Sequence, residues 1–174
     1  MEKKIKEMLG AQLVGFRLPR YEEIPDVGLY LEQTTKYIAD CLAPLTEASL
    51  TASMISNYVK RGLIANPVKK QYTREQIAYL IFIAVIKTVL SMEEIRLIVK
   101  IQQSSYTSQV AYDYFCMEFE NILEYVFGMK PEMEQVGVSH SDEKIMLRNT
   151  IITVAHKVYL DKLFALLQNA EEEK

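Results

Sequence analysis

The residues best suited to a chemical interaction lie between positions 51 and 74, and the partner that they suit is an anion. This stretch holds five basic side chains and no acidic one: Lys60, Arg61, Lys69, Lys70 and Arg74. Because the stretch contributes +5 to a chain whose net charge is −3, the remainder carries −8. A cationic segment on an acidic protein predicts an anionic partner, with nucleic acid as the first candidate, although charges also cluster without any function.

Three small polar residues, Ser53, Ser56 and Asn57, add a second kind of chemistry to the same stretch. We expect them on one face of a short helix, opposite an apolar stripe that includes Ile55 and Tyr58. Short hydrogen-bonding side chains can approach base edges closely, and basic side chains neutralise phosphates. The predicted DNA contacts are Ser53, Ser56, Asn57, Lys60, Arg61, Lys69, Lys70 and Arg74.

Capping signals divide this stretch into a helix, a basic loop and the start of a second helix. Thr51 can cap a helix that runs to about Arg61, and Gly62 fits the left-handed position that follows its end. Residues 65–72 predict a short loop or a two-stranded wing, with the paired lysines at its tip or edge. Thr73 then begins the next helix with a capping box.

The helix that follows, over about 74–88, is apolar nearly all round, which places it in the middle of a domain. Ser91 and Glu94 form a second capping box, which opens a helix that runs through Ile101. The segment 102–107 (QQSSYT) is the most linker-like stretch in the middle of the chain.

The flanking segments predict further helices and one irregular arm. Residues 1–10 predict a frayed helix, and residues 11–28, which contain two glycines and two prolines, predict an arm along the surface of the first domain. Apolar spacing predicts helices over 29–42, 108–127 and 142–170. The last of these has two apolar stripes, which indicates burial against a neighbouring helix and against a second subunit.

The order of helix, wing and two capped helices resembles the MerR-type winged helix-turn-helix over roughly residues 51–100. The residues that carry the resemblance are Tyr58, Gly62-Leu63-Ile64, Pro67, Lys70-Gln71-Tyr72, Leu80, Ile83, Lys87 and Leu90-Ser91-Met92-Glu93-Glu94-Ile95. Ser56 stands where MerR-type proteins commonly carry an arginine that contacts phosphate. With LPRYEEIPDVGLYLEQ before it, the chain is also similar to an uncharacterised bacterial domain family that carries this module, and that similarity implies no activity.

These observations together predict an all-α protein in two parts. Residues 1–101 are expected to form a winged helix-turn-helix domain with an N-terminal arm, and residues 107–174 a helical hairpin for dimerisation or effector binding. The MerR-type resemblance implies a sequence-specific transcription regulator that binds DNA as a homodimer, through contacts between its C-terminal helices. The alternative is a helical protein-interaction module with a winged-helix fold that does not bind DNA.

The second part is rich in aromatic and methionine side chains, for which two interpretations stay open. They form either the core of the hairpin and a dimer interface, or an effector pocket for an apolar ligand. The residues concerned are Tyr106, Tyr112, Tyr114, Phe115, Met117, Phe119, Tyr125, Phe127, Met129 and Met133.

Other classes of function find no support in the sequence. There is no GxSxG, HExxH, P-loop or GxGxxG motif, so we expect neither an enzyme nor a cofactor. His140 and His156 lack partners at metal-ligand spacing, and His156 is expected to pack on its helix. Cys41 and Cys116 lack CxxC spacing, which predicts buried thiols and a reducing, cytoplasmic location. The chain has no run of eighteen apolar residues, so no membrane span is expected.

Overall fold

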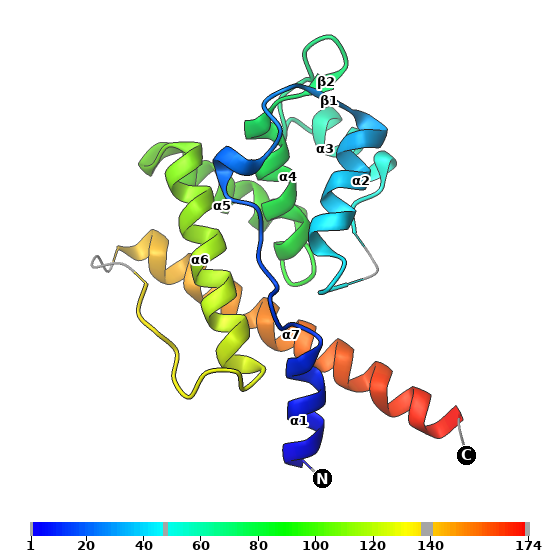
Figure 1. Cartoon of the computed structure of the whole chain (residues 1–174). Coiled ribbons are helices and arrows are strands. Elements are labelled where there is room, and N and C mark those ends of the chain that lie inside the picture. The colour runs from blue at the N-terminus through cyan, green and yellow to red at the C-terminus, as the bar shows by residue number, and fades with distance from the viewer. Residues whose placement is uncertain (1, 47–48, 137–140, 173–174) are drawn as a thin grey trace.

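The computed structural model describes residues 2–46, 49–136 and 141–172, and these residues are mostly helical (Figure 1). In chain order the elements are α1 (Glu2–Ala11), the 3-10 helix η1 (Tyr21–Glu23), β1 (Leu29–Tyr30), α2 (Leu31–Leu42), α3 (Ala52–Lys60), β2 (Gln71–Tyr72), α4 (Arg74–Ile86), α5 (Met92–Ser105), α6 (Ser108–Val126) and α7 (Asp142–Glu172). The predicted all-α class is confirmed, with a two-stranded antiparallel sheet as its small extended part.

Helix α4 lies at the centre, as its continuous apolar sequence predicted. Its buried residues lie all round the helix, and α2, α6, α7 and η1 contact it on different sides. The predicted capping box fixes its start: Thr73 N–H donates to Gln76 Oε1 at 2.9 Å, and Gln76 N–H donates to Thr73 Oγ1 at 3.3 Å. The second predicted box forms in the same way between Ser91 and Glu94 at the start of α5.

Helices α6 and α7 make the most extensive contact in the molecule and join the core around α4. Phe115 of α6 stacks on Phe119 with ring centroids 5.7 Å apart, and meets Phe82 of α4 edge to face at 4.9 Å. Between α6 and α7, the fully buried carboxylate of Glu118 pairs with the guanidinium of Arg148. Residues of both predicted parts therefore belong to one hydrophobic core, and the division of function between them stays a prediction.

The sequence predicted that the N-terminal arm lies along the surface of the first domain. In the structure the arm also contacts α6, in the second part. Arg20 donates two hydrogen bonds to Glu120 of α6, at 2.7 and 2.6 Å, and Leu18 N–H donates to the same carboxylate at 2.9 Å. Tyr21 N–H donates to Asp113, also on α6, at 2.8 Å. The arm crosses from α4 to α6 because its backbone donors find carboxylates on α6, about a hundred residues away in sequence.

Two boundaries differ from their predictions. Leu29 and Tyr30 form a strand and not the first turn of a helix, because they pair with Tyr72 and Gln71. Helix α5 continues through Ser105, where the sequence suggested a linker, and Thr107 caps α6 almost at once. Polar residues such as Gln102 and Ser105 suggested the linker, but their side chains hydrogen-bond to nearby groups without ending the helix.

Candidate nucleic-acid interface

Helix α3 presents one polar face to solvent. Thr51 caps it as predicted, since its Oγ1 accepts a hydrogen bond from Met54 N–H at 3.2 Å. Ser53, Ser56, Asn57 and Lys60 are all exposed, whereas Ile55 and Tyr58 on the other side are buried. The spacing of three and four residues puts the four polar side chains on one face, so the structure brings these predicted contacts together.

A glycine turn ends α3 and leads the chain back into the core. Gly62 has a φ of 68°, and its N–H donates to Val59 O at 2.9 Å. Leu63 N–H donates to Tyr58 O at 2.9 Å, which completes a Schellman motif, and Leu63 is buried. This anchor fixes the exposed Arg61 at the end of the polar face.

Arg96 of α5 is a basic residue of this region that the sequence did not single out. It is exposed, and its guanidinium donates to the backbone carbonyl of Arg61 at 2.7 Å. The two residues are 35 positions apart in sequence. No local pattern pairs them, and only the packing of α5 beside the end of α3 brings them together.

The predicted wing is a tight hairpin on top of this surface (Figure 1). Val68 N–H donates to Gln71 O at 3.1 Å, and Gln71 N–H donates to Val68 O at 2.9 Å. These two bonds close a two-residue loop whose central residues are Lys69 and Lys70. The base of the wing is held by β1 and by Gln76, whose Nε2 donates to Ala65 O at 2.8 Å.

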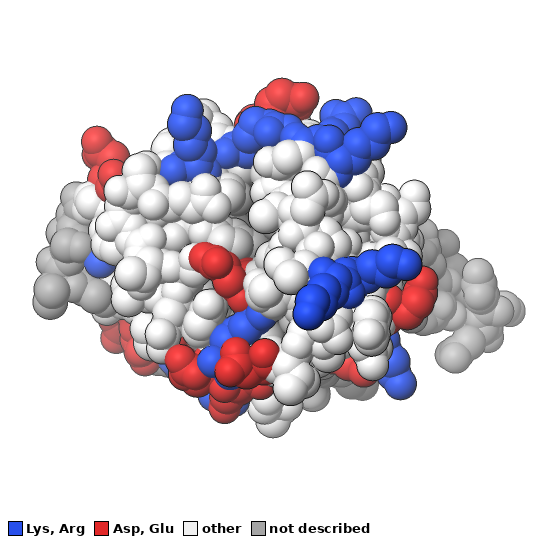
Figure 2. Space-filling view, turned by 90° about the horizontal axis from the view of Figure 1, so that it is seen from above, with Lys and Arg blue, Asp and Glu red and all other residues white. Residues whose placement is uncertain are grey.

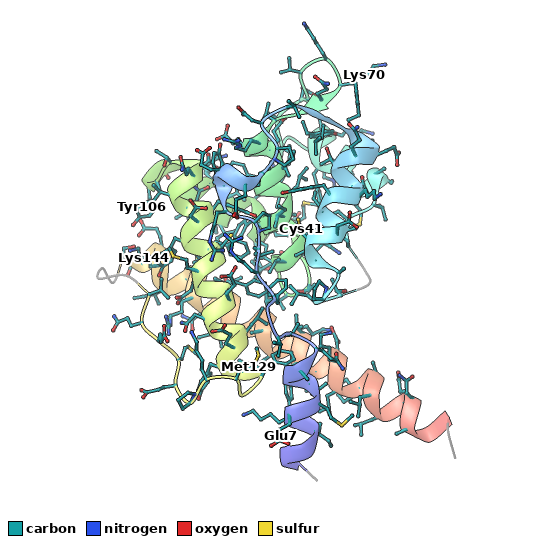
Figure 3. The ribbon with its side chains drawn as sticks, viewed as in Figure 1. Glu7, Cys41, Lys70, Tyr106, Met129 and Lys144 are labelled. Atoms are coloured by element: carbon teal, nitrogen blue, oxygen red, sulfur yellow. The ribbon has the colours of Figure 1, made fainter. Side chains whose placement is uncertain are left out.

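Both lysines of the loop adopt left-handed backbone conformations. The φ angles are 50° for Lys69 and 65° for Lys70, as in a type I′ turn, where asparagine and glycine are strongly preferred. Residues with a β-carbon are strained there by roughly 1–2 kcal/mol each. Both side chains are exposed, and Lys70 points away from the body of the molecule at the tip of the wing (Figure 3).

Arg74 is not placed with the other predicted contacts. Its guanidinium donates to the carboxylate of Glu22 at 2.6 Å and to the carbonyl of Ile24 at 2.9 Å, and it lies over the ring of Tyr21. The side chain is 19% exposed. Arg74 therefore holds the N-terminal arm against α4, apart from the other predicted contacts, and its contact with DNA stays a prediction.

Charge is distributed unevenly over the face that carries the wing. Seen from above, a row of Lys and Arg side chains runs along one edge, and a second basic group lies further in (Figure 2). An acidic group lies directly beside the row, and other acidic side chains lie near the middle of this face and toward the opposite edge (Figure 2). A polyanion approaching this face would meet its most favourable potential along the basic row.

The cysteines and histidines offer no competing site in the described part of the chain. Cys116 is buried, and burial raises the pKa of its thiol to about 12. Cys41 is half-buried, and burial raises its pKa to about 11, so both thiols are protonated at neutral pH. His156 is exposed and does not pack on its helix as expected, because Ala155 and Val158 occupy the buried side, while His140 lies outside the described residues. No group of three or more metal-ligating side chains occurs among the described residues.

Comparison with known proteins gives one finding. The profile of a family described as "Domain of unknown function (DUF1836)" matches residues 19–115, more than half of the chain. Neither the curated proteins nor the solved structures provide a match. The matched segment begins within the arm at residue 19, includes the polar face of α3, the wing, and helices α4 and α5, and ends within α6. Over the described residues, no helix combines the length and the apolar character that crossing a membrane requires.

Proposed function

The chain belongs to the DUF1836 family, whose description assigns no activity, and we propose that it is a sequence-specific DNA-binding transcription regulator. In this proposal α2, α3 and the wing act as a MerR-like winged helix-turn-helix, and two copies of the chain bind one operator. The alternative, a helical protein-interaction module that does not bind DNA, is tested by the same experiment.

The observation that carries the proposal is the pair of lysines at the tip of the wing. Lys69 and Lys70 occupy the two strained positions of a type I′ turn that asparagine and glycine would fill without strain. Strain that persists at an exposed position supports a functional reason for the residue, because stability alone would favour a different one. Two charges held on a rigid hairpin suit a role in contacting the phosphate backbone.

The polar face of α3 supplies the second half of the proposal. Ser53, Ser56 and Asn57 are short, exposed donors and acceptors near the N-terminal half of the helix. Asparagine can make two hydrogen bonds to the major-groove edge of adenine, at N6 and N7, and serine can bond bases or phosphates. We infer that α3 lies in the major groove, while Lys60 and Arg61 at its end, together with the wing, neutralise phosphates.

The proposal predicts steep dependence of DNA binding on salt. Lys60, Arg61, Lys69 and Lys70 provide four phosphate contacts in each copy, so a dimer is expected to show a slope of log K against log salt of roughly −7. Affinity should fall by about 10³ to 10⁵ between 50 and 200 mM salt. The measurement is fluorescence anisotropy of duplexes that the full chain selects from a random library.

Specificity gives the second readout of the same experiment. The selected duplexes should share two half-sites whose centres lie one helical turn apart, about 34 Å, or a multiple of it. Binding that does not change with salt, or a library that yields no common motif, would contradict the proposal. Absence of DNA binding together with a protein partner that covers α3 and the wing would support the interaction module instead.

The dimer that the proposal requires has a candidate surface on α7. Leu160, Phe164 and Leu167 lie on one face of the helix at spacings of four and three, and they are 43%, 55% and 44% exposed. Met8 of the neighbouring helix α1 is 47% exposed. Exposed apolar side chains in such a stripe suit burial against a second copy.

A single charge on this stripe is therefore expected to separate the dimer. Phe164→Glu should raise the dissociation constant of the dimer at least about 10-fold, since each Phe164, 55% exposed in one copy, loses roughly half of the 1.5–3 kcal/mol that full burial contributes, and the dimer contains two. Asn169→Glu adds the same charge on a different side of α7 and should leave the dimer intact. Sedimentation velocity over a concentration series distinguishes the two variants, and equal behaviour of both would exclude this stripe as the interface.

A further inference from the structure

We propose that a cavity between α4, α5, α6 and the start of α7 binds a small, neutral aromatic molecule with one hydrogen-bonding group. The cavity measures about 130 Å³. An apolar cavity of about 150 Å³ holds benzene, so the enclosed space suits one aromatic ring, and its open side leaves room for a second fused ring. The inference does not depend on DNA binding.

Six aromatic side chains line the cavity. They are Tyr79, Phe82, Tyr106, Tyr112, Tyr114 and Phe115. Phe82 and Phe115 are packed edge to face at 4.9 Å, and Phe115 is almost fully buried, so this wall is already ordered without a ligand. Such a wall favours another ring, through burial of apolar surface and through edge-to-face or offset stacking.

A small group of polar atoms at one side gives the ligand an orientation. The hydroxyl of Tyr79 donates to Gln102 Oε1 at 2.8 Å and lies 3.4 Å from Ser108 Oγ. These three side chains line the cavity and connect α4, α5 and α6. A phenolic O–H or an indole N–H can share this group, because hydroxyl and amide oxygens accept more than one hydrogen bond.

The charges at the cavity favour a neutral ligand. Glu143 and Lys144, at the start of α7, line it with opposite signs, and hydrogen bonding by Ser141 lowers the pKa of Glu143. The ammonium of Lys144 lies 4.9 Å from the centroid of the Tyr114 ring. Lys144 lies on the same flank of the molecule as Tyr106 (Figure 3). Because these two charges offset each other and the exposed surface of the wall is almost entirely apolar, burying a net charge on the ligand would be costly.

Thermal unfolding of the full chain with indole, phenol or toluene tests this site. At about 100 times its dissociation constant, a bound probe should raise the Tm by roughly 5–10 °C. Ala111→Met fills the cavity from α6 and should abolish the shift, while Ala165→Met, on α7 outside the cavity, should preserve it. The proposal fails if no probe raises the Tm of the wild type, or if both variants respond like the wild type.

A second variant keeps the test decisive should Ala111→Met prevent folding. Gln102→Leu removes a hydrogen-bonding partner from one side of the cavity and adds only apolar surface. It should weaken binding of indole and phenol about tenfold or more while leaving the affinity for toluene within about threefold. Either of two results would overturn the assignment of the polar group: an equal loss of affinity for all three probes, or no loss of affinity for any of them.

Discussion

Replacing Lys69 with asparagine and Lys70 with glycine is expected to stabilise the protein and to weaken its binding to DNA by about 100- to 1,000-fold at 0.15 M salt. Stability should rise by about 1 kcal/mol or more, because these residues relieve the left-handed strain at φ angles of 50° and 65°. Binding should fall because a dimer loses four phosphate contacts, each about fivefold at this salt concentration. Urea unfolding and fluorescence anisotropy measure the two effects separately.

The opposite signs of these two effects make the prediction specific. A variant that bound DNA poorly because it was unfolded would show lower stability, not higher. Lys6→Gln with Lys157→Gln removes the same charge from α1 and α7, which lie at the end of the molecule away from the wing (Figure 1). That control should bind DNA within about threefold of the wild type, and an equal loss in both variants would show that only net charge matters.

Replacing Arg148 with methionine is expected to lower the free energy of unfolding by about 3–5 kcal/mol. The change leaves the carboxylate of Glu118 buried without its cation, and Glu118 has no exposed surface. For a chain of this length such a loss corresponds to a Tm lower by roughly 6–20 °C. Urea unfolding of the two proteins at pH 7 measures the difference.

The pH dependence of that difference follows from Glu118 itself. Burial raises the pKa of Glu118 above its ordinary value of 4.5, and Arg148 counteracts part of that rise. Without the arginine the folded pKa should rise further, so the folded variant binds a proton more readily than its unfolded form. Its stability should therefore fall as pH rises from about 4.5 through the folded pKa, and the deficit relative to wild type should be smaller at pH 5 than at pH 8.

Two controls separate the buried pair from charge in general. Glu118→Met with Arg148→Met replaces both partners with apolar side chains and should lie much closer to the wild type than Arg148→Met alone. Lys157→Met removes one partner of an exposed pair with Asp161, on the same helix, and should cost less than about 1 kcal/mol. If the double variant were as unstable as the single one, the buried charge would not be the cause.

The sequence predicted the local structures that depend on interactions between residues close together in the chain. The caps at Thr51, Thr73 and Ser91 each depend on a side-chain oxygen and a backbone N–H three residues later. The turn at Gly62 depends on one residue that tolerates a positive φ. These signals located α3, α4 and α5 and the wing, because each interaction closes within a single turn of chain.

What could not be predicted was decided by residues far apart in sequence. Strand β1 is two residues long, and its pairing with β2 spans more than forty positions. Arg74 looked like a free cation because its partner Glu22 lies 52 positions earlier. The aromatic cavity depends on the packing of four helices, so the sequence left a packed core and a ligand pocket as open alternatives.

The ion pair between Arg20 and Glu120, which attaches the N-terminal arm to α6, affects the order in which the chain becomes structured. The two residues are 100 positions apart. A ribosome that adds about 5–20 residues per second needs about 5–20 s to make Glu120 after Arg20. Throughout that interval the arm has no carboxylate to receive Leu18 N–H or the guanidinium of Arg20. The arm can therefore attach to α6 only late in synthesis, after α6 has emerged from the ribosome.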